Sequence, residues 1–90
     1  MVIKYFADIR TLTGRQEQQW TKAAPTLRAL LGELASQYGA AFEKRIFPQG
    51  QVSGSVMFLV NGQHIELLNG LETPLRPEDD VVFFPMVAGG

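Results

Sequence analysis

The chain has 90 residues, of which 46% are hydrophobic and 19% charged, and its formal net charge is −1. This length and composition predict one globular domain with a modest core, and they exclude a disordered chain. The balanced charge, without a basic stripe, argues against a nucleic-acid-binding surface. The apolar run VMFLV is far too short to span a bilayer, and the N-terminus MVIKYFADIR lacks the pattern of a signal peptide. The absence of cysteine excludes disulfides and thiol catalysis and fits a cytoplasmic protein, which is the expected location.

The first half of the chain predicts a hairpin followed by one helix. Val2–Ile9 is rich in β-branched and aromatic residues and predicts a strand, Gly14 marks a turn, and Gln16–Thr21 is the weaker partner strand. Thr26 is placed to cap the start of a helix that Gly39 closes. The apolar residues of this helix follow a spacing of three and four, which forms one stripe: Leu27, Leu30, Leu31, Leu34, Ala35 and Tyr38.

The second half predicts mainly strands. Ala40–Phe47 is long enough for one or two helical turns, and a loop follows from Pro48. Val56–Val60 is a strong strand candidate, and Asn61-Gly62 is the best hairpin-turn signal in the sequence. Gln63–Leu68 is the expected return strand.

The last part of the chain predicts a long connection and a final strand. Two prolines, Pro74 and Pro77, oppose regular structure within residues 69–80. The run VVFFPMV is then the last strand. The resulting order of two strands, one helix and three strands is that of the α+β class and the β-grasp fold. We therefore expect one domain over residues 1–90, with a mixed four- or five-stranded sheet, one main helix on one face, and a flexible tail over residues 87–90.

The predicted sheet has more apolar surface than one helix can cover. Side chains alternate between faces along a strand, yet both faces of the strands at 56–60 and 81–86 are apolar. Contiguous exposed apolar surface on a small protein usually marks a partner site. The alternative is that Phe42–Pro48 folds over the second face.

The side chains offer little chemistry of their own. His64 is the only histidine, so no metal cluster is expected. The acidic residues 78–80 fit a solvated turn better than a hard-ion site. Ser53 and Ser55 have no base arranged to activate them. The remaining reactive group is the terminal carboxylate of Gly90, and we expect the chain to bind no cofactor.

A carboxylate is a poor electrophile, but another enzyme can activate it with ATP as an acyl-adenylate. A sulfur nucleophile would then leave a thiocarboxylate, whereas a thiol followed by an amine would leave an amide bond to another protein. Both routes require the terminus to enter another active site. The four residues from Val87 to Gly90 reach about 13 Å when extended, and glycine adopts backbone angles closed to other residues.

Several segments resemble the MoaD/ThiS family of ubiquitin-like sulfur carriers over nearly the whole chain. These segments are YFADIR, TLRALLGELASQYG, LVNG and LETPLRPEDDVVFFPMVAGG. The ending is more similar to the small subunit of molybdopterin synthase than to the thiamine carrier, and LNGLETPL is similar to the archaeal branch, which includes small protein modifiers. Two positions depart from the family pattern: Met86 stands where a second proline is frequent, and Thr11 follows Arg10 where glutamate is frequent.

The resemblance implies a function and its partners. An E1-like enzyme would use ATP to adenylate Gly90, which would become a thiocarboxylate and donate sulfur to molybdopterin. The large subunit of the synthase, a MoaE-like protein, would receive the tail. The resemblance makes Gly89 and Gly90 the active terminus. It also implies contacts with the partners through the preceding residues: Phe84, Pro85, Met86, Val87 and Ala88.

Three other functions remain open at this point. The chain could be a protein modifier that is joined through Gly90 to lysines of its targets. It could donate sulfur for thiamine, cysteine or tRNA thiolation. It could also be a β-grasp interaction module in which the two glycines are incidental.

Overall fold

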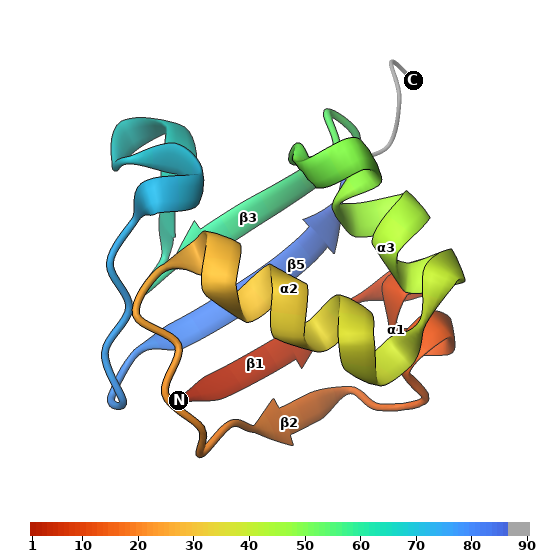
Figure 1. The fold of residues 1–90 in the computed structure, drawn as a ribbon, viewed down its shortest axis with the longest axis horizontal. Helices are drawn as coiled ribbons and strands as arrows, with labels where there is room; N and C mark the ends of the chain where they lie inside the picture. Colours follow the sequence, from red (N-terminus) through yellow and green to blue (C-terminus); the bar gives the residue numbers. More distant parts are fainter. Residues whose placement is uncertain (87–90) are drawn as a thin grey trace.

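The computed structural model describes residues 1–86, which form a five-stranded mixed sheet in the order β2-β1-β5-β3-β4 (Figure 1). β1 and β5 pair in parallel, and the other neighbours pair antiparallel. This is the α+β, β-grasp arrangement expected from the sequence. The strands are β1 (Val2–Tyr5), β2 (Glu17–Gln19), β3 (Val56–Val60), β4 (Gln63–His64) and β5 (Asp80–Pro85). The α-helices are α1 (Ala7–Thr13), α2 (Leu27–Tyr38) and α3 (Ala40–Ile46).

The first strand is shorter than predicted, because a helix follows it. β1 ends at Tyr5, and α1 occupies positions that we expected to form the end of the strand and a turn. Ile9 and Thr13, one helical turn apart, are both buried, so the short helix has an inward face. Gly14 ends this helix in the left-handed conformation, with φ 71°, and its N–H donates to the carbonyl of Arg10. α1 is therefore a short helix that the sequence did not predict, in addition to the expected main helix.

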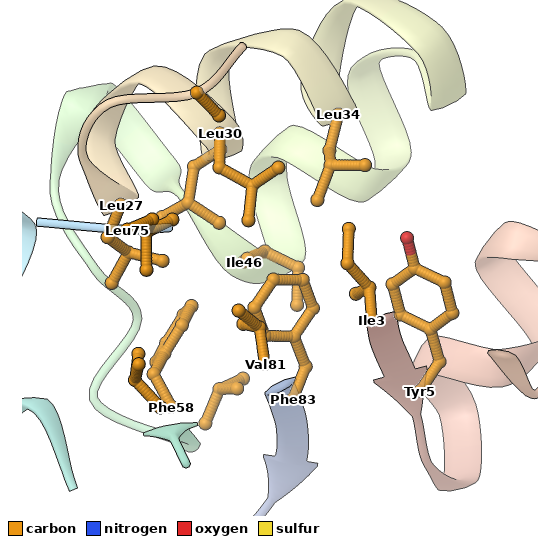
Figure 2. Packing of buried hydrophobic residues seen from close by; sticks show 14 of the residues in the cluster. Ile3, Tyr5, Leu27, Leu30, Leu34, Ile46, Phe58, Leu75, Val81 and Phe83 are labelled. Atoms are coloured by element: carbon orange, nitrogen blue, oxygen red, sulfur yellow. The ribbon is translucent and has the colours of Figure 1, made fainter. Parts of the chain in front are cut away.

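The main helix agrees with the sequence pattern. The Thr26 hydroxyl oxygen accepts a hydrogen bond from the N–H of Ala29 at 3.2 Å, and the Gly39 N–H donates to the carbonyl of Ala35. α2 crosses one face of the sheet (Figure 1). Its leucines point toward the sheet side chains Ile3, Val81 and Phe83 (Figure 2). Four leucines of the stripe are buried: Leu27, Leu30, Leu31 and Leu34.

The segment after α2 forms the helix α3, which packs on the same face of the sheet as α2. Phe42 and Ile46 of α3 are fully buried in the same core as the leucines of α2. The rings of Phe42 and Tyr38 lie 5.4 Å apart, and Ile46 lies between the helices and the sheet (Figure 2). The hypothesis that Phe42–Pro48 covers the second face of the sheet is therefore wrong. The short helix completes the cover of the first face, because α2 alone is too narrow to bury it.

The hairpin after β3 is confirmed, but its second strand is short. Asn61 and Gly62 both have positive φ, 52° and 82°, as a two-residue turn of this kind requires. β4 has only two residues and passes into a 3₁₀ turn at Ile65–Leu67. This turn buries the Ile65 side chain, so the chain leaves the sheet edge to fill the core. Two further 3₁₀ turns lie at Pro48–Gly50 and Gly70–Glu72.

One acidic residue in the turn before β5 has a structural role that the sequence did not predict. Asp79 is buried, and its carboxylate accepts hydrogen bonds from the Asn61 side-chain amide at 2.9 Å and from the Arg76 N–H at 2.8 Å. The Asn61 side-chain oxygen accepts in turn from the N–H of Asp80. These bonds join the β3–β4 turn to the start of β5. The prediction of a fully solvated acidic turn was therefore wrong for Asp79.

A buried polar cluster fixes the edge strand β2 to the core. The hydroxyls of Tyr5 and Tyr38 both donate to the side-chain oxygen of Gln18, at 2.7 and 2.6 Å. The Gln18 amide nitrogen donates to Gln37 on α2. Burial raises the pKa of Tyr5 far above its usual range, so this hydroxyl remains a donor at every physiological pH. β2 can pair with β1 because Gln18, its one inward-facing side chain, has hydrogen-bond partners in the core.

Candidate functional site

The side of the sheet opposite α2 carries a strip of mainly apolar side chains, which we call the open face. Register partners share a face, so Phe84 lies beside Met57, and Val82 lies between Leu59 and Lys4. His64 lies beside Leu59 at the edge. The open face consists of Lys4, Phe6, Met57, Leu59, His64, Val82, Phe84 and Met86.

Exposure along the open face rises toward the end of β5. Val82 is half-buried, whereas Phe84 is 47% exposed and Met86 41% exposed. The Phe6 ring packs against Phe84 with the ring centroids 5.3 Å apart, which holds the Phe84 side chain against the sheet. A held aromatic side chain loses little conformational freedom when a partner covers it. The open face therefore has the features of a docking surface that is most accessible at the end of β5.

The residues predicted to contact partners are not all on one face. Phe84 lies on the open face, and Met86, two positions further, is exposed next to it. Pro85 is paired with buried Val56, so it is half-buried on the other side of the strand. The structure thus separates the two exposed side chains from the proline between them. The remaining predicted residues lie outside the described part of the chain: Val87, Ala88, Gly89 and Gly90.

A polar cluster lies at the end of the sheet where β5 terminates. The Arg45 guanidinium donates from Nε to the Asp8 carboxylate at 2.7 Å and from Nη1 to the Ser55 hydroxyl at 2.8 Å. The Ser55 carbonyl accepts from the N–H of Met86 at 2.9 Å. The hydrogen bond from Arg45 lowers the pKa of Asp8, so the carboxylate is charged at neutral pH. Sequence reasoning missed this cluster, because Asp8 and Arg45 are 37 positions apart.

The described residues hold no side-chain set that suggests catalysis or a metal site. Within residues 1–86, no group of three or more histidine, cysteine or acidic side chains could hold a metal ion. The hydroxyls of Ser53 and Ser55 lie 2.9 Å apart and bond to each other, and the Ser55 hydroxyl also accepts from Arg45, so neither bonds to a base. The Nδ1 atom of His64 accepts a hydrogen bond from the N–H of Glu66. In the same residues, no helix has the length and hydropathy needed to cross a membrane.

Comparison with known proteins identifies the family. The sequence model of the ThiS family matches residues 3–90. A protein of Archaeoglobus fulgidus named as a sulfur carrier is 35% identical over 65 residues, which are 72% of this chain and 74% of that protein. Small archaeal modifier protein 3 of Haloferax volcanii is 32% identical over 89 residues, which are 98% of this chain and 96% of the relative.

A solved structure agrees with the sequence comparisons. The solution structure of small archaeal modifier protein 1 from Methanosarcina acetivorans has a TM-score of 0.84 and 31% identity. The match covers 99% of this chain and 94% of the other. The fold, the family match and the named relatives all agree with the resemblance found in the sequence. This chain belongs to the ThiS family of β-grasp proteins, which groups it with ubiquitin-like sulfur carriers and small archaeal modifiers.

Proposed function

We propose that this chain is the sulfur carrier of molybdopterin synthesis and that its reactive group is the carboxylate of Gly90. The observation that carries the proposal is the position of the open face. The exposed side chains Phe84 and Met86 lie next to the segment that leads to Gly89-Gly90. A partner that covers this surface would receive the diglycine directly. The similarity of the ending to the small subunit of molybdopterin synthase supports the choice of acceptor.

The reaction would begin on an E1-like enzyme that binds ATP. The Gly90 carboxylate attacks the α-phosphate, pyrophosphate leaves, and an acyl-adenylate forms. Hydrosulfide then attacks the acyl carbon and displaces AMP, which leaves a thiocarboxylate; if a persulfide attacks instead, a second thiol must cleave its S–S bond to release the same product. The ATP belongs to the partner, and this chain acts as a substrate and carrier of sulfur. The thiocarboxylate is the nucleophile of the next step, in which sulfur passes to the pterin precursor in a MoaE-like large subunit.

The open face and the tail have separate tasks in this proposal. Phe84 and Met86 contribute apolar surface for docking, and Val87 and Ala88 follow them into the partner's channel. Pro85 acts on the backbone, because its ring fixes φ and removes a hydrogen-bond donor at the end of β5. Its half-buried position on the side away from the open face supports this role over a direct contact.

A second candidate function is conjugation to other proteins. The modifier from Haloferax volcanii aligns with almost the whole of this chain at 32% identity. Conjugation would start from the same Gly90 adenylate, which a thiol and then a lysine amine would consume. Sulfur donation for thiamine, cysteine or tRNA thiolation differs from the first proposal only in the final acceptor.

Intact mass measurement tests the proposal. The full chain is incubated with the host's E1-like enzyme, ATP and a sulfur donor, and a chain lacking Gly90 is the control. A mass increase that matches the replacement of one oxygen by sulfur, absent from the control, supports the carrier. Adding the MoaE-like subunit and the pterin precursor must then yield molybdopterin. Adducts on other proteins without a thiocarboxylate would favour the modifier, and neither product with an active enzyme would refute both.

A further inference from the structure

The β3–β5 register continues by one pair beyond the end of β5, where Met86 lies opposite Ser55. Pro85 has no N–H, so it cannot donate where the strand ends. The N–H of the next residue, Met86, donates to the carbonyl of Ser55 at 2.9 Å. Only four residues follow Met86 in the sequence. The Ser55 carbonyl therefore anchors the last described residue before the diglycine segment.

Ser55 is held in turn by a charged side chain from another element. Its hydroxyl accepts from Nη1 of Arg45 at 2.8 Å, and it lies 2.9 Å from the hydroxyl of Ser53. Arg45 also contacts both carboxylate oxygens of Asp8, from Nε at 2.7 Å and from Nη2 at 3.4 Å. One guanidinium thus connects α1, α3 and the residue just before β3.

This set of contacts requires arginine. The planar guanidinium carries five donors in a rigid fork, so it can hold a carboxylate and a hydroxyl at the same time. A lysine ammonium carries all its donors on one nitrogen, so it would bind either Asp8 or Ser55 but not both. The Arg45 side chain is only 25% exposed, which limits its conformational freedom, although its partners Asp8 and Ser55 are exposed to water.

We propose that Arg45 is a positioning residue for the C-terminal diglycine. By holding Asp8 and Ser55 together, it fixes the backbone carbonyl that anchors Met86 and so directs residues 87–90 toward the partner's active site. The inference rests on the proposed function, in which Gly90 is activated there. Reaction rates are sensitive to such placement, since a misplacement of about 1 Å can cost roughly 10²-fold.

Amide hydrogen exchange tests the anchoring without any partner. In Arg45→Met, the Met86 amide should exchange at least about tenfold faster, while the Phe83 amide in the centre of the sheet keeps its rate. Lys44→Met is the matched control, because it removes the same charge from an exposed neighbour on α3 and should change neither amide. Equal exchange of Met86 in both variants would overturn the proposal. Faster exchange along the whole of β5 would overturn it too, because Arg45 would then be a general stabiliser.

Kinetics with the activating enzyme test the consequence. We expect ATP–pyrophosphate exchange to show a kcat about tenfold lower for Arg45→Met with KM changed less than about twofold, because docking on the open face is intact. Arg45→Lys should recover little of the loss. A rise in KM alone would make Arg45 a docking contact and refute the positioning role. If the unmodified chain gave no exchange at all, the proposed function would fail, whereas the amide measurement would still decide the role of Arg45 in anchoring Met86.

Discussion

Replacing Phe84 with alanine should weaken partner binding and leave the fold largely intact. The side chain is 47% exposed, so roughly half of its 150–250 Å² of surface is free for a partner to cover. At about 25 cal/mol per Å², the loss of this contact corresponds to roughly 2 kcal/mol, or about thirtyfold in affinity. The buried half, against Phe6 and Met57, is of similar area and should cost about 2 kcal/mol of unfolding free energy.

The neighbouring residue provides the control. Phe83 is fully buried on the opposite side of the same strand, where its ring packs against Tyr5 and Phe58. Phe83→Ala leaves a cavity in the core and should cost about 3–5 kcal/mol of unfolding free energy. Substitution of Phe84 should thus lower partner affinity at a smaller cost in stability, whereas substitution of its neighbour Phe83 should mainly lower the unfolding free energy.

Two measurements check this prediction. Urea denaturation gives the unfolding free energy of each variant, and titration calorimetry with the E1-like enzyme gives the affinity. The reasoning is refuted if Phe84→Ala binds as tightly as the unmodified chain. It is also refuted if the two variants lose equal stability, because the assignment of faces in β5 would then be wrong.

Three further outcomes follow from the structure. Asp79→Ala should lower the unfolding free energy by about 2–3 kcal/mol in urea denaturation, because it leaves two donors of a buried carboxylate without partners. Arg45 lowers the pKa of Asp8, so this pair stabilises the fold above the unfolded pKa of about 3.9, and the contribution is lost as the pH falls through the lower folded value. Asp8→Asn should flatten that acid dependence in pH-dependent denaturation. Deletion of Gly90 should leave the circular dichroism spectrum and melting temperature unchanged, yet abolish the thiocarboxylate mass shift.

The sequence predicted those elements whose signals are local. Thr26 caps α2 through its own hydroxyl, and Asn61-Gly62 adopts the two positive φ angles that the turn needs. The stretch Val56–Val60 has a burial pattern that alternates as a strand should. In each case a few adjacent residues determine the local structure, so it could be predicted without knowledge of distant contacts.

The parts that escaped prediction depend on contacts distant in sequence. α1 begins within the strand-like stretch YFADI, and it is helical because Ile9 and Thr13 are buried together. The last three residues of that stretch, Ala7 to Ile9, therefore follow tertiary packing over local preference. The open face was predicted as surplus apolar area, but strand alternation alone could not tell which face α2 and α3 would cover.

Carrier and modifier chemistry share every step up to the Gly90 adenylate, and this yields a last prediction. The open face is mainly apolar and includes Met86, which directly precedes the tail in the sequence, so it should act when the chain docks on the activating enzyme. Phe84→Ala should then reduce the rates of thiocarboxylate formation and of protein conjugation by the same factor when the adenylating step limits both. Parallel assays with one enzyme preparation measure the two rates. Unequal factors would mean that the open face also contacts a later partner, and the choice between the two fates would then depend partly on this chain.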